Sequence, residues 1–317
     1  LALGGVAYAW VNATWNGDYS AMARPAIVAS SDPAVVAHGD YVFNAIAHCS
    51  ACHGGPAAST RKRGDRFPMA GGLVFHADPF GIFVARNLTS DRETGVGAQS
   101  DADLARAVRS GVDHQGRFLP FMKLAVGPIA DEDLTALISY VRTFAPVRRQ
   151  EEPEVWGFLG KYLAATKLKP APQVPPPYVA ASVEPSADRG AYLANGPADC
   201  RFCHTKHDAM AGFVETAVPF SGGDVDADEV DPAFEFQAPN LTPDPKSSPL
   251  AAWDEATFLA RFRGGKVFAG THMPWENFAE LTDADVRSLY RYLRSLPPVS
   301  VVAAPSHRPA GWKPASS

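Results

Sequence analysis

Two copies of the pentapeptide Cys-x-x-Cys-His constrain this chain more than any other feature. They occupy residues 49–53 and 200–204 and contain all four cysteines of the 317-residue sequence. The chain has nine histidines, and two of them stand directly after a Cys-x-x-Cys pair. Chance placement of four Cys and nine His does not produce this pentapeptide twice.

The spacing within the pentapeptide fits covalent attachment of haem. Two thiols three positions apart can add to the two vinyl groups of one haem, and the adjoining His then reaches the iron. A thioredoxin-like redox pair needs no such His, and a zinc site needs two further ligands in each half. The sequence therefore predicts two covalently bound haem c groups. The attachment residues are Cys49, Cys52, Cys200 and Cys203, and the proximal iron ligands are His53 and His204.

The two pentapeptides belong to a longer internal repeat. Their first cysteines are 151 residues apart, and the same step relates Gly39 to Gly190, Tyr41 to Tyr192 and Gly71 to Gly222. With small shifts, Asn-Leu-Thr-x-Asp occurs at residues 87–91 and 240–244, and residues 131–142 resemble residues 283–294. The repeated Asn-Leu-Thr loops either line a haem crevice or form Asx-type turns, and we expect turns. The chain is thus predicted to contain two tandem, duplicated domains.

Each half reads as a few helices joined by loops. Apolar residues recur at helical spacing in residues 134–141 and 286–293, which predicts a closing helix in each half. Cap signals occur at Asp32, Ser100 and Thr282. The 28 Pro and 26 Gly indicate many irregular connections, so large sheets are not expected. We therefore predict an all-α fold of two haem-binding domains joined by a Pro-rich linker.

The domain boundaries follow from composition. We expect a first domain at residues 26–150, a linker at 151–186, a second domain at 187–300 and a tail at 301–317. The linker holds an amphipathic helix within residues 154–168 and a Pro-rich spacer at 169–177. The tail is rich in Pro, Ala and Ser, and we expect it to have little fixed structure.

Residues 1–25 form a lead-in to the first domain. The first eleven residues are apolar and uncharged but shorter than the roughly 20 that span a bilayer. They fit a secretory apolar region or the end of an N-terminal membrane anchor, and we expect the anchor.

The repeat also selects candidates for the sixth iron ligand, which is usually Met or His. Among the five methionines, only Met122 and Met273 obey the 151-residue step, so the interval from His53 to Met122 equals that from His204 to Met273. No His outside the pentapeptides has a His partner at that step. Met69 and His272 are local competitors, and a methionine can also simply fill the core. We predict Met122 and Met273 as the second axial ligands.

Charge excludes some partners. The formal net charge is -5 and the isoelectric point is about 6.0, which provides no basic footprint for nucleic acid or for an anionic lipid surface. A role in nucleic-acid binding is therefore not expected.

These motifs together resemble class I c-type cytochrome domains in tandem, as in the cytochrome c subunits of membrane-bound alcohol and aldehyde dehydrogenases. The resemblance is carried by the two pentapeptides, the double glycines Gly71-Gly72 and Gly222-Gly223, the Asn-Leu-Thr loops, Met273-Pro274 and the closing helices. It covers most of residues 33–300. It implies iron held by His and Met, at the positions His53 with Met122 and His204 with Met273.

We therefore expect an electron-transfer subunit and no substrate chemistry, because six-coordinate iron offers no open position. It would relay electrons between a membrane or exported redox complex and another carrier. The expected partner is a respiratory, photosynthetic or dehydrogenase complex on the periplasmic side of the bacterial inner membrane. The alternatives are a di-haem enzyme, such as a peroxidase or thiosulfate dehydrogenase, and a structural subunit of a larger complex.

Overall fold

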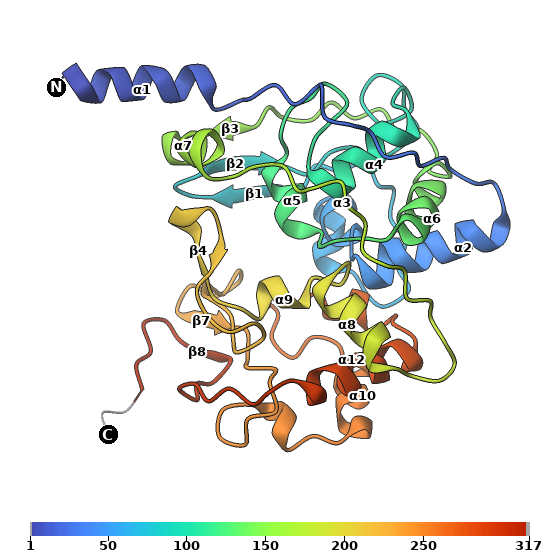
Figure 1. Cartoon of the computed structure of the whole chain (residues 1–317), viewed down its shortest axis with the longest axis vertical. Helices are drawn as coiled ribbons and strands as arrows, with labels where there is room; N and C mark the ends of the chain where they lie inside the picture. The colour runs from blue at the N-terminus through green and yellow to red at the C-terminus, as the bar shows by residue number, and fades with distance from the viewer. Residues whose placement is uncertain (1, 315–317) are drawn as a thin grey trace. The chain divides into compact units, whose positions relative to one another are not determined.

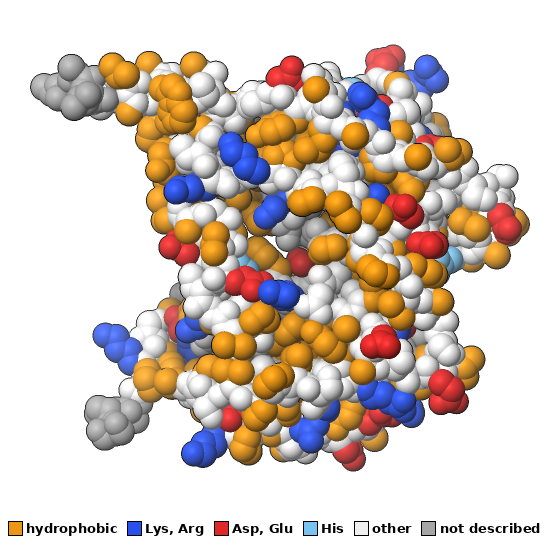
Figure 2. All heavy atoms as spheres, in the orientation of Figure 1, with side chains coloured by type: hydrophobic (Ala, Val, Ile, Leu, Met, Phe, Trp, Pro, Cys, Tyr) orange, Lys and Arg blue, Asp and Glu red, His pale blue; other side chains and the backbone are white. Residues whose placement is uncertain are grey.

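The computed structural model describes residues 2–314, which divide into two compact units (Figure 1). The first unit runs to Tyr178 and also includes Met210–Gly212. The second comprises Val179–Ala209 and the chain from Phe213 onward. Each unit contains one Cys-x-x-Cys-His pentapeptide. On the face that Figure 2 shows, acidic and basic side chains are interspersed with apolar ones.

The helices of the first unit carry the pentapeptide and its supports. They are α1 (Ala2–Thr14), α2 (Pro33–Tyr41), the π-helix η1 (Val42–Ile46), α3 (Ser50–His53), η2 (Pro56–Thr60), α4 (Asp101–Ser110), α5 (Pro120–Ala125), α6 (Asp131–Val141) and α7 (Phe158–Thr166). Its strands are β1 (Val74–Ala77), β2 (Gly81–Val84) and β3 (Val155–Trp156). Within residues 2–314, no helix combines the length and the apolar character needed to cross a bilayer.

The second unit repeats this plan with local changes. Its helices are α8 (Ala187–Asn195), α9 (Cys200–Cys203), η4 (Pro249–Ala251), α10 (Glu255–Arg263), α11 (Trp275–Phe278) and α12 (Asp283–Ser295). Its strands are β4 (His207–Asp208), β5 (Val214–Glu215), β6 (Val225–Ala227), β7 (Phe234–Gln237) and β8 (His307–Pro309). The short helix η3 (Ala209–Ala211) begins at the last residue of one stretch of the second unit, and its other two residues belong to the first unit.

The expected all-α class is wrong, because the described residues form three small antiparallel sheets. Their orders are β1-β2-β3, β4-β5 and β6-β7-β8. In both three-stranded sheets a hairpin follows the double glycine, and the third strand comes from beyond the closing helix. Strands of two to four residues carry too little periodicity to be distinguished from loops in a sequence.

Two local expectations change with the sheets. The segment expected as one helix at residues 154–168 begins with the strand β3, and only its later part is the helix α7. The tail is not without structure, because β8 pairs with β7 at its three residues. Pairing with a partner far away in sequence overrides the loop-like composition of both segments.

The predicted helix starts are confirmed. The side chain of Asp32 accepts a hydrogen bond from the backbone N–H of Ala34 at 2.8 Å. Ser100 and Thr282 accept from the N–H three residues ahead, each at 3.1 Å. These caps satisfy amide groups that a helix end otherwise leaves without a partner.

A close helix crossing occurs in the described part of each unit. The helix α2 packs on α6, and α8 packs on α12. A Cβ atom added at Gly39 would lie 1.9 Å from the carbonyl oxygen of Ala136, and one added at Gly190 would lie 2.0 Å from that of Ser288. Both crossings therefore need glycine, and the internal repeat relates the two glycines to each other.

Each crossing also buries a carboxylate beside a basic side chain. In the first unit His38 Nε2 lies 2.6 Å from Asp133, and in the second Arg189 Nε lies 2.9 Å from Asp285. Both carboxylates are fully buried or nearly so. His38 and Arg189 occupy equivalent positions of the internal repeat, so the repeat keeps the buried carboxylate but changes the basic residue beside it.

Because the basic residue differs between the units, replacing the buried aspartate by asparagine should lower the free energy of unfolding by different amounts in the two units. Asp285→Asn leaves a buried guanidinium that cannot lose its proton, so we expect a loss of about 3–5 kcal/mol in the free energy of unfolding. Asp133→Asn should cost less than half as much, because the His38 side chain is 30% exposed to water whereas that of Arg189 is only 2% exposed. Denaturant unfolding of both variants measures the difference, and equal losses would contradict this account.

Candidate haem-binding sites

Both pentapeptides lie on a short helix entered through a left-handed residue. The first is on α3 and the second on α9. The residue before the first cysteine has positive φ in both units, 41° at His48 and 52° at Asp199. This conformation is uncommon for residues other than glycine. Its occurrence at equivalent positions of the internal repeat shows that both units enter the motif by the same turn.

The two motif histidines are held by backbone carbonyl groups. His53 Nδ1 lies 2.8 Å from the carbonyl oxygen of Arg86, and His204 Nδ1 lies 2.9 Å from that of Pro239. A carbonyl oxygen only accepts, so Nδ1 carries the proton and Nε2 carries the lone pair. This orientation is typical of metal-bound histidine. Arg86 and Pro239 were not predicted from the sequence, although each directly precedes the Asn of a repeated Asn-Leu-Thr loop.

The protonation states fit the same role. Both imidazoles are buried, and burial lowers the pKa of His53 and of His204. Neutral rings are the form that binds iron. Burial also raises the pKa of the Cys49 and Cys200 thiols to about 12. A redox-active Cys-x-x-Cys pair instead needs a lowered thiol pKa, so these sites do not resemble thioredoxin-like centres.

The first glycine of each double glycine forms a backbone hydrogen bond with the histidine of the pentapeptide. The Gly71 N–H donates to the His53 carbonyl and the Gly222 N–H to the His204 carbonyl, each at 3.0 Å. Gly71 has φ of 69° and Gly222 has φ of 111°, values that other residues rarely adopt. The glycines therefore let the chain fold back onto the motif histidine.

The Asn-Leu-Thr loops are turns, as expected. The Asn side-chain oxygen accepts from the Thr N–H two residues ahead at 2.9 Å in both units. The side-chain nitrogen of Asn87 donates to the carbonyl of Val147, and that of Asn240 to the carbonyl of Val299, both at 2.8 Å. Each loop thus ties the segment after the closing helix to the segment that holds the motif histidine.

The methionines fall into different surroundings. Met122 lies in α5, and Met273 lies just before α11, and both are partly buried. Met69 is 1% exposed, and its carbonyl accepts from the Leu88 N–H at 2.8 Å. Phe220, its equivalent in the internal repeat, is also 1% exposed, and its carbonyl accepts from the Leu241 N–H at 2.8 Å. Met69 therefore occupies a core position that phenylalanine fills in the second unit.

The competitor in the second unit is an exposed histidine. The His272 side chain is 43% exposed, and its Nε2 lies 3.4 Å from Glu229. Met122 and Met273 remain the candidates that the repeat favours. Their bonds to iron stay a prediction.

Comparison with known proteins gives relatives over most of the chain. The cytochrome c subunit of gluconate 2-dehydrogenase from Pantoea cypripedii is 32% identical over 281 residues, which cover 84% of this chain and 60% of the relative. The cytochrome c subunit of the quinone alcohol dehydrogenase from Komagataeibacter europaeus is 30% identical over 85% of this chain and 57% of its own length. The diheme cytochrome c-type protein of Cereibacter sphaeroides is 28% identical over 79% of this chain and 82% of its own length. No family model matches the chain.

The resemblance to c-type cytochromes is thereby confirmed. The similar proteins are named as cytochrome c subunits of dehydrogenases and as a di-haem cytochrome, and the similarity includes both pentapeptide-bearing halves. The chain spans only part of the dehydrogenase subunits, about 60% of the one from gluconate 2-dehydrogenase.

Proposed function

We propose that this chain is a di-haem c-type cytochrome that carries electrons between a membrane or exported redox complex and another carrier. The observation that carries the proposal is the matched pair of motif histidines. Each has Nδ1 fixed to a carbonyl and Nε2 available to an iron beside a Cys-x-x-Cys pair.

Each unit would hold one haem. Cys49 and Cys52 would attach the first haem through two thioether bonds, and Cys200 and Cys203 would attach the second in the same way. His53 and His204 would bind iron from one face, and Met122 and Met273 from the other. Haem supplies the one-electron chemistry, while the protein sets the potential through its ligands and burial. With a histidine and a methionine holding each haem iron, no open position would remain for a substrate.

The names of the relatives support a dehydrogenase complex as partner. They include cytochrome subunits of gluconate 2-dehydrogenase and fructose dehydrogenase. We place the chain on the periplasmic side of the bacterial inner membrane. The proposed domains are residues 26–150 and 187–300, joined by the linker at residues 151–186.

Carbon monoxide tests whether the chain is a carrier. The reduced protein is expected to show no rapid change of its absorption spectrum with carbon monoxide, because methionine occupies the sixth position of both irons. A di-haem enzyme needs an open or exchangeable position. Rapid binding of carbon monoxide to either haem would contradict the proposal and favour the enzyme.

A further inference from the structure

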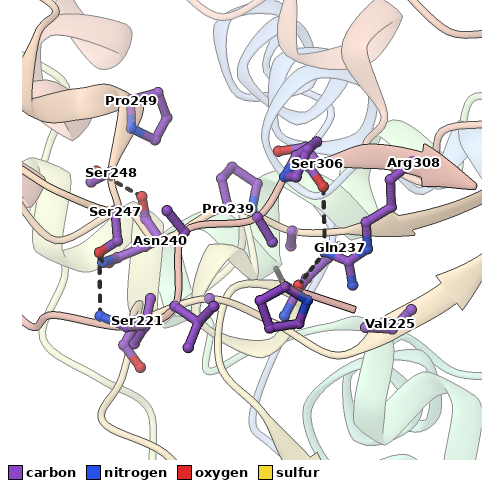
Figure 3. A pocket seen from close by; sticks show the side chains of 18 of the residues that line it. Ser221, Val225, Gln237, Pro239, Asn240, Ser247, Ser248, Pro249, Ser306 and Arg308 are labelled. Atoms are coloured by element: carbon purple, nitrogen blue, oxygen red, sulfur yellow. Dashed lines mark hydrogen bonds between the residues drawn. The ribbon is translucent and has the colours of Figure 1, made fainter. Parts of the chain in front are cut away.

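The second unit contains a pocket that takes no part in the proposed haem binding. Its volume is about 810 Å³, and residues 301–306 form one of its walls. In Figure 3, Asn240, Ser247 and Ser248 lie on one side of it, and Gln237, Ser306 and Arg308 lie on the other. Pro239, whose carbonyl holds His204, also lines the pocket.

The first unit fills the corresponding place with its own side chains. The Glu151 carboxylate accepts a hydrogen bond from the backbone N–H of Asn87, and its side chain is only 8% exposed. The guanidinium of Arg86 lies 3.4 Å from the same carboxylate. The Arg149 side chain packs over Gly72. An internal carboxylate is therefore bound beside the loop that holds His53.

Matching hydrogen bonds fix the correspondence between the units. The Arg149 N–H donates to Thr94 Oγ1 at 3.1 Å, and the Val301 N–H donates to Ser247 Oγ at 3.3 Å. Counting on from this pair, Ala303 stands where the first unit has Glu151. Pro239 stands where the first unit has Arg86. Short apolar residues thus replace the three side chains that fill the first site.

The second unit retains the backbone N–H group that, in the first unit, donates a hydrogen bond to the carboxylate. Asn240 is 3% exposed, and its backbone N–H has no acceptor within residues 2–314, whereas the equivalent N–H of Asn87 has Glu151. Asn240 lines the pocket, so water or a ligand there can take the place of the missing acceptor. Lys206 and Lys246 also line the pocket. Both are exposed, and neither ammonium forms an ion pair within the described part of the chain.

We propose that this pocket binds a carboxylate supplied from outside the chain, with one oxygen on the Asn240 N–H. Lys206 and Lys246 at the rim balance its charge. In the first unit, burial raises the pKa of Glu151 while Arg86 opposes that effect. The second pocket is open to water, so the charged form of a ligand loses less hydration there. The binding does not depend on the proposed electron-transfer role.

Calorimetric titration of the full haem-loaded chain tests the proposal. Succinate is expected to bind saturably with one site per chain, and succinamide, its neutral analogue, is expected not to bind. A second carboxylate source is the blocked peptide acetyl-Ala-Glu-Ala-amide. Binding of succinate alone assigns a small-molecule source, and binding of the peptide assigns a protein side chain. Absence of saturable binding by both overturns the proposal.

Three variants test whether the carboxylate binds in this pocket. Ala303→Glu places in the second unit a carboxylate equivalent to Glu151 of the first, which should compete with the ligand and weaken its binding at least tenfold. Ala180→Glu adds the same charge at an exposed position of the same unit and should leave the affinity unchanged. Lys246→Gln removes one rim charge without adding volume and should weaken binding severalfold. Unchanged affinity in both Ala303→Glu and Lys246→Gln would overturn the assignment to this pocket.

Discussion

The double variant Cys200→Ser, Cys203→Ser is expected to retain one covalently bound haem instead of two. Serine forms no thioether bond, and His204 alone holds haem only by a reversible iron bond. Intact-mass measurement of the denatured protein should therefore show the loss of one haem mass. The expected effect is complete, because covalent attachment in each unit depends on its own pair of thiols.

The matched variant in the first unit is Cys49→Ser, Cys52→Ser. It should lose the other haem and keep the one attached at Cys200 and Cys203. A double variant that still carries two covalently bound haem groups, or a wild-type chain that carries one, would contradict the duplicated sites.

Removal of either proposed methionine ligand should open one iron. Met122→Ala and Met273→Ala are each expected, when reduced, to bind carbon monoxide at half of their haem. The reason is that alanine cannot bind iron and leaves the sixth position to solvent or added ligand. Titration of the absorption change against total haem gives the bound fraction directly.

Met69→Leu is the matched control for the first unit. Met69 is 1% exposed, so this substitution of similar volume should cost less than about 1.5 kcal/mol of stability. It should leave the carbon monoxide response of the wild type unchanged. Binding in Met69→Leu, together with none in Met122→Ala, would transfer the ligand assignment to Met69.

The features that the sequence predicted correctly are local ones. The caps at Asp32, Ser100 and Thr282 depend on side chains that reach backbone groups two or three residues away. The Asn-Leu-Thr turns form within three residues, and the closing helices follow from an apolar stripe. Short-range physics fixes these elements, so the residue pattern is sufficient to find them.

The features that were missed depend on residues far apart in the chain. The strand β8 exists because Arg308 lies opposite Glu235, 73 residues earlier, and their side chains also pair at 2.6 Å. The carbonyl that holds each motif histidine lies 33 residues away in one unit and 35 in the other. The periodicity of apolar residues does not reveal such long-range pairings. A comparison of the two halves could have revealed them, because each pairing occurs in both units at nearly the same sequence separation.

The measurement that tests the account most directly is near-infrared magnetic circular dichroism of the oxidised full chain. Iron held by His and Met gives a methionine-to-iron charge-transfer band. We expect that band at an intensity corresponding to both irons. Absence of the band, or an intensity corresponding to one iron, would contradict the assignment of Met122 and Met273 as the paired ligands of His53 and His204.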